Sequence, residues 1–167
     1  VQKLIFWNIG CFLFSLVFFY SFSVGSFQIP TWIALSSDFG TFIRTPWTLI
    51  TFNFFHAGFL HLIFNLMVLH FSGRLFSTYF TDKQLLGVYV LGGIFSGVTF
   101  VLSYIFIGKA GLLVGASGAI MAILIATATY APFMLLRIPL IGTVKLWHVA
   151  FVILLVDLIQ MPLDNTG

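Results

Sequence analysis

The sequence predicts an all-α, polytopic membrane protein, and three features support this fold class. Hydrophobic residues make up 60% of the 167 positions and charged residues only 7%, whereas about a quarter of the residues in a typical soluble domain are charged. Long apolar segments recur along the chain, and aromatic residues mixed with polar ones collect in one connection. A soluble domain is therefore excluded, and residues 1–167 are expected to form a single membrane domain.

Five segments are candidate membrane spans, because about 20 mostly apolar residues in a helix cross the roughly 30 Å hydrocarbon core. They comprise residues 4–22, 61–76, 85–107, 114–136 and 143–159. The long connection between the first two contains Pro30, Pro46, Trp32 and Trp47. Tryptophan side chains prefer the headgroup region, so this connection is expected to lie in the membrane interface.

The charges of the connections predict the orientation, because cytoplasmic loops are enriched in Lys and Arg. With a cytoplasmic N-terminus, Arg44 and Lys109 fall outside and five basic residues fall inside. These five are Lys3, Arg74, Lys83, Arg137 and Lys145. A multi-pass protein with a cytoplasmic N-terminus is therefore expected, in a bacterial cytoplasmic membrane. The net charge of +3 is too small for a nucleic-acid-binding surface.

Polar side chains are concentrated where the second apolar segment begins, in the stretch HAGFLHLIFN. His61 and Asn65 are four residues apart and share one helix face, while His56 precedes them by five residues. Polar groups inside spans are costly and often functional. The alternative is that they bond backbone carbonyls and fix the connection to the helix. A metal site is not expected, because the histidine spacing is unsuitable and no carboxylate follows.

A serine among small residues opens the fourth apolar segment, in the stretch GLLVGASGAIMA. Gly115, Ala116, Ser117 and Gly118 could form a face for close helix packing. The alternative is a nucleophile that needs space around it. If Ser117 lies at the same depth as His61, side-chain and backbone donors could stabilise an oxyanion beside it.

The order of these two motifs resembles the rhomboid family of intramembrane serine proteases. H-x4-H-x3-N stands on the second segment and G-x-S-G on the fourth, and the resemblance also includes the long first connection with its PWT run at residues 46–48. It implies a rhomboid-like helix bundle, with five of an expected six spans present. It also implies transmembrane protein substrates within the lipid bilayer, and neither a cofactor nor a metal.

The resemblance implies a role for each motif residue. Ser117 matches the nucleophile, and His61 and Asn65 match the side chains that stabilise the oxyanion together with the Ser117 amide. His56 matches a supporting histidine. Gly115 and Gly118 match the glycines that let the serine helix pack against the last catalytic helix.

Several positions depart from the family pattern. Thr48 follows Trp47 where the family often has arginine, Ser77 stands where a glutamate is common, and Met121 replaces an aromatic residue. The family's general base is a histidine on a sixth span, in a pattern like A-H-x-x-G-x-x-x-G, which is absent from these residues.

No other histidine is expected to replace this base. His70 lies too deep along the second segment, and His148 lies near the cytoplasmic end of the fifth. The sequence is therefore expected to be a truncated piece, with the base beyond Gly167. The alternative function is a rhomboid-like pseudoprotease that binds membrane proteins without cleaving them. A transporter or channel is less favoured, because the polar residues gather near one face.

Overall fold

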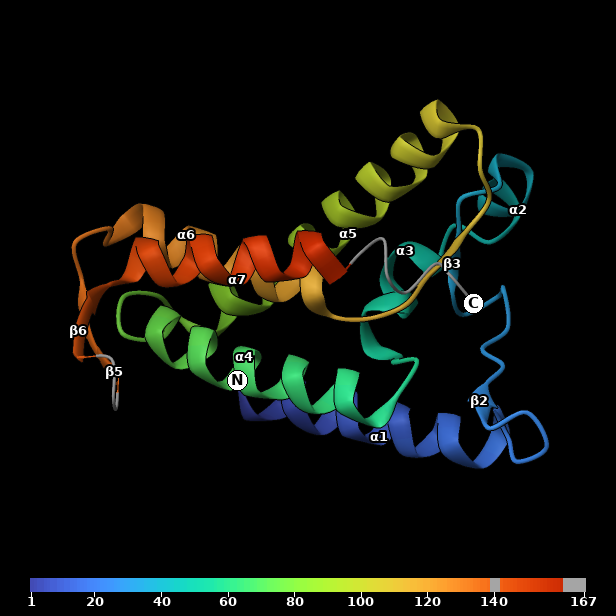
Figure 1. Ribbon diagram of the computed structural model, residues 1–167, viewed down its shortest axis with the longest axis horizontal. Coiled ribbons are helices and arrows are strands. Elements are labelled where there is room, and N and C mark those ends of the chain that lie inside the picture. The colour runs from blue at the N-terminus through green and yellow to red at the C-terminus, as the bar shows by residue number, and fades with distance from the viewer. Residues whose placement is uncertain (139–141, 161–167) are drawn as a thin grey trace.

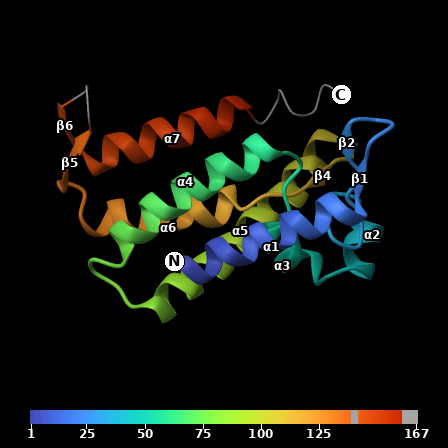
Figure 2. The ribbon, with the colours of Figure 1, turned by 90° about the horizontal axis from the view of Figure 1, so that it is seen from below.

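The computed structural model describes residues 1–138 and 142–160 and is mostly helical (Figure 1). Five long helices account for most of it, and each falls within or around one of the predicted segments. They are α1 (Gln2–Phe18), α4 (Phe59–Phe76), α5 (Asp82–Ile107), α6 (Ser117–Tyr130) and α7 (Leu146–Gln160). Successive long helices alternate in direction, as the two views show (Figures 1 and 2).

The long first connection is folded rather than open. It contains strands β1 (Tyr20–Ser21), β2 (Ser26–Phe27) and β3 (Leu35–Ser36), helices α2 (Phe39–Arg44) and α3 (Thr48–Thr51), and the 3₁₀ helix η1 (Phe52–Phe54). The indole Nε1 of Trp47 donates to the carbonyl of Trp32 at 2.9 Å. Both rings are about half exposed. This hydrogen bond links the two tryptophans, and both side chains remain half exposed at the surface.

Among the described residues, three short strand pairs accompany the helices of this mostly helical fold. β1 pairs with β2, β3 pairs with β4 (Leu112–Leu113), and β5 (Leu135–Ile138) pairs with β6 (Gly142–Lys145), all antiparallel. The prediction extended the first segment to residue 22 and the fourth over 114–136. The residues at these ends lie in strands and turns instead, and Pro132 lies just beyond the end of α6.

Within the part of the chain that the structure describes, two helices, α4 and α5, are long and apolar enough to cross a membrane by length and composition. The helices Gln2–Phe18 and Ser117–Tyr130, and residues Leu146–Leu155 of α7, are apolar but shorter. The number of five spans therefore stays a prediction. The predicted external ending at residues 161–167 lies outside the described residues.

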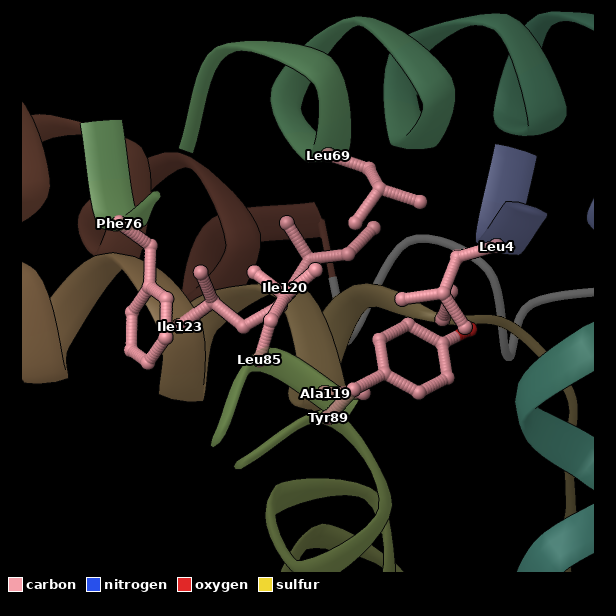
Figure 3. Packing of buried hydrophobic residues seen from close by; sticks show 9 residues of the cluster. Leu4, Leu69, Phe76, Leu85, Tyr89, Ala119, Ile120 and Ile123 are labelled. Atoms are coloured by element: carbon pink, nitrogen blue, oxygen red, sulfur yellow. The ribbon is translucent and has the colours of Figure 1, made fainter. Parts of the chain in front are cut away.

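The main core lies between α1, α4, α5 and α6 (Figure 3). Its buried members are Leu4, Leu69, Phe76, Leu85, Tyr89, Ala116, Ala119, Ile120 and Ile123. Helix α6 packs against α4, α5 and α7, so it occupies the centre of the bundle. This position fixes the depth at which α6 begins, and Ser117 is its first residue.

Candidate active site

The segment that leads to Ser117 is held by the first connection. β4 pairs with β3, and the amide of Gly111 donates to Ser37 Oγ at 2.8 Å. Farther along, the amide of Gly115 donates to the carbonyl of Phe52 in η1 at 2.9 Å. The start of α6 is therefore positioned by backbone groups of two distant segments as well as by helix packing.

Gly115 brings the two sequence motifs together. Its φ is +128°, in a region that side-chain-bearing residues rarely adopt. A Cβ placed on it would lie 2.8 Å from Cε1 and 2.9 Å from Nε2 of His61. The imidazole of His61 is thus in contact with backbone that stands two residues before Ser117. The structure thereby places His61 and Ser117 at the same end of the bundle, as the sequence predicted.

Asn65 lies one helical turn after His61 on α4. Its side chain is buried, and Nδ2 donates to the carbonyl of His61 at 2.9 Å. An amide nitrogen has two N–H groups, so this bond fixes the carboxamide and leaves a second N–H as a donor. The same bond is expected if the Asn65 side chain has only a structural role and bonds a backbone carbonyl of its own helix.

His56 stands between η1 and α4 and is fully buried. Its ring meets that of His61 edge to face, with the ring centroids 5.2 Å apart. Within the described part of the chain, neither ring nitrogen has a hydrogen-bond partner of good geometry. Burial and, secondarily, the charge of His61 lower the pKa of His56 to about 3, while the Phe54 backbone acts weakly in the opposite direction. His56 is therefore neutral near pH 7.

The first turn of α6 presents backbone donors. Ala116 occupies the N-cap position and has no side-chain acceptor. The Ile120 amide donates to the carbonyl of Ala116 at 2.9 Å, and the amides before it have no acceptor within the helix. A helix N-terminus also carries partial positive charge. The Ser117 amide can therefore stabilise negative charge that develops beside its own hydroxyl.

Gly118 makes a close contact with α5. A Cβ on Gly118 would overlap Oγ and Cβ of Ser96. The resemblance predicted that this glycine packs against the last catalytic helix, and that role stays a prediction. The observed contact with Ser96 was not predicted, although the small residues on α5 recur at the helical spacing that a packing face requires.

The remaining histidines lie away from Ser117. His70 is exposed on α4, and His148 is exposed on α7 and stacked on Trp147 at a centroid distance of 3.7 Å. Among the described side chains, no three His, Cys, Asp or Glu residues gather as metal ligands would. The site thus has a serine and backbone donors at the start of α6, with the His61 imidazole in contact at Gly115, and the Asn65 carboxamide lies one turn along α4 from His61.

Comparison with known families gives a match. The family model described as the Rhomboid domain matches residues 44–166, which include every motif residue. No curated protein and no solved structure matches the chain. Because the family match covers well over half of the sequence, the protein belongs to the rhomboid family of integral membrane proteins.

Proposed function

We propose that the protein is an intramembrane serine endopeptidase that cleaves transmembrane proteins, with Ser117 as the nucleophile. The observation that carries this proposal is the contact between Gly115 and the imidazole of His61. It joins the second and fourth predicted segments at the start of α6. Family membership supports the same reaction class.

In this reaction Ser117 Oγ attacks a peptide carbonyl of the substrate and loses its proton to a base. The Ser117 amide, the His61 ring and the carboxamide of Asn65 stabilise the oxyanion that forms. The leaving amine takes a proton as the intermediate collapses to an acyl-enzyme. Water then hydrolyses the acyl-enzyme and regenerates Ser117.

The base is not one of the histidines that the structure describes. His56 is a poor proton acceptor because burial lowers its pKa to about 3, and His70 and His148 are remote. His61 is not the base, because in this proposal it donates a hydrogen bond to the oxyanion. Rhomboid proteases use a histidine in a pattern like A-H-x-x-G-x-x-x-G as the base, and the proposed reaction requires such a group.

The distribution of basic residues supports an external active site and a cytoplasmic N-terminus. Arg74 lies in the last turn of α4 and Lys83 in the first turn of α5. Arg137 and Lys145 lie on the β5–β6 hairpin. All four basic residues lie at the end of the bundle that is remote from His61 and Ser117. Because basic residues are enriched on the cytoplasmic side of a membrane, this end is expected to face the cytoplasm.

A fluorophosphonate probe tests the proposal on the full-length protein in native membranes. The probe reacts with an activated serine, so Ser117→Ala should abolish labelling. Ser103→Ala is a matched control, because Ser103 is exposed on α5 and its hydroxyl donates to the Thr99 carbonyl of its own helix. Labelling that survives Ser117→Ala would refute the assignment of the nucleophile.

The alternative is a pseudoprotease that binds membrane proteins on the same scaffold. It is favoured by the absence of a base beside Ser117 among the described residues. Complete lack of probe labelling in the folded wild-type protein, together with capture of intact membrane proteins, would support this alternative instead.

A further inference from the structure

A buried polar network crosses the bundle beneath the candidate site. The side-chain amide of Asn8 on α1 donates to the Leu4 carbonyl at 2.7 Å and to the Tyr89 hydroxyl at 3.3 Å. The Tyr89 hydroxyl on α5 donates to the backbone carbonyl of Asn53 in η1 at 3.1 Å. Asn8, Tyr89 and Asn53 are all at most 3% exposed. Three segments distant in sequence thus meet in an apolar core.

The network ends on the short helix that also contacts the nucleophile segment. Asn53 follows Phe52, whose carbonyl accepts the Gly115 amide at 2.9 Å. It precedes the connection that carries His56. A displacement of η1 therefore moves the acceptor that fixes Gly115, and with it the backbone in contact with the His61 ring.

We propose that Tyr89 is a positioning residue of the active site, which holds η1 through the Asn53 carbonyl and thereby sets the geometry of Gly115 and Ser117. This role rests on the proposed protease function. Tyr89 acts through η1 and does not touch the reacting atoms. Small displacements of reacting groups reduce rates strongly, so a bond to a neighbouring support can influence the reaction.

Gly93 also helps to hold Asn53 in place. It lies one helical turn after Tyr89 on α5, and a Cβ placed on it would lie 2.7 Å from Cγ of Asn53. The lack of a side chain at Gly93 thus lets the Asn53 carboxamide pack against α5. The hydroxyl of Tyr89 and the close approach at Gly93 fix opposite parts of the same residue.

The test compares Tyr89→Phe with two controls in the full-length protein. Tyr89→Phe removes only the hydroxyl, and with it the bond to the Asn53 carbonyl and the longer bond from Asn8. Loss of the bond to Asn53 alone corresponds to about a fivefold effect on the rate. We expect the rate of fluorophosphonate labelling and kcat to fall about fivefold, with little change in KM. Tyr130→Phe makes the same chemical change at an exposed position on the far end of α6 and should have no effect.

Leu85→Ala separates positioning from stability. Leu85 is buried in the same core, one turn before Tyr89, and its truncation leaves a cavity that lowers stability. It should lower the midpoint of thermal unfolding more than Tyr89→Phe, while the folded fraction is labelled at the wild-type rate. Gly93→Ala should slow labelling, whereas Gly87→Ala should not, because a Cβ at Gly87 meets no atom within 4 Å.

Hydrogen exchange provides a readout independent of catalysis. Tyr89→Phe should speed exchange in peptides that cover residues 52–56 and 111–116, and Leu85→Ala should not do so selectively. Tyr89→Phe labelled at the wild-type rate would overturn this role alone, as would an equal slowing in folded Leu85→Ala. An unlabelled wild-type protein would overturn the proposed protease function, and the positioning role with it.

Discussion

At the end of the molecule that carries Ser117, the helices are tied to the first connection by backbone hydrogen bonds and close glycine contacts. At the opposite end, α6 and α7 are joined by the β5–β6 hairpin, where Phe133 and Leu135 are largely exposed. The first end holds buried polar residues that need defined partners, and the second holds exposed apolar and basic ones. Substitutions at the first end should therefore change the chemistry, and those at the second should change only local stability.

The largest expected effect is that of Gly115→Ala. The new Cβ would press on the His61 ring in a backbone conformation that alanine rarely adopts. Displacement of these groups should slow fluorophosphonate labelling by about 100-fold or more. Gly25→Ala is the matched control, because Gly25 also has positive φ but a Cβ there meets no atom within 4 Å. Equal labelling of the two variants would show that the contact between Gly115 and the His61 ring does not set the geometry of the site.

The pH dependence of stability tests the burial of His56. Its pKa is about 3 in the folded protein and near 6.5 when it is exposed. Between these values the unfolded chain binds a proton that the folded protein does not. Stability should therefore be lost as the pH falls below about 6.5, at about 1.4 kcal/mol per pH unit down to about pH 3.

His56→Gln should remove this dependence, because glutamine does not titrate. The measurement is the midpoint of thermal unfolding in detergent between pH 4 and 8, where 1 kcal/mol corresponds to a shift of about 2–4 °C for a chain of this size. His148→Gln, at an exposed site on α7, should keep the wild-type slope. Parallel profiles for wild type and His56→Gln would contradict the buried neutral state of His56.

The contact between Gly118 and Ser96 allows a rescue experiment. Gly118→Ala should destabilise the protein by about 1–3 kcal/mol through overpacking against α5. Ser96→Gly removes the atoms that the new methyl group would overlap, so the double variant should recover most of the loss. Chemical or thermal unfolding of the single and double variants measures this coupling. Additive losses would show that the two positions do not share the contact.

Sequence reasoning located the helices and both motifs, because apolar segments and polar residues within them are local signals. It missed the pairing of Leu35 with Leu113, because the two residues are far apart in the chain and leave no local signal. It missed the short hairpins β1–β2 and β5–β6, because their apolar residues also fit the ends of membrane spans. It also missed the support beneath the site. Asn8 and Tyr89 are polar residues in apolar helices, but the sequence analysis did not single them out, and only the fold shows that Tyr89 links Asn8 to Asn53.

The smallest expected effect lies in the hairpin at the opposite end. Lys145 Nζ lies 5.3 Å from the centroid of the Phe133 ring, and both side chains are exposed. A cation–π contact at an exposed site contributes about 0.5–1 kcal/mol. Lys145→Gln should therefore lower stability by no more than this and leave probe labelling of Ser117 unchanged. A fall in the labelling rate would show that the hairpin communicates with the site along α6, and that the two ends do not act independently.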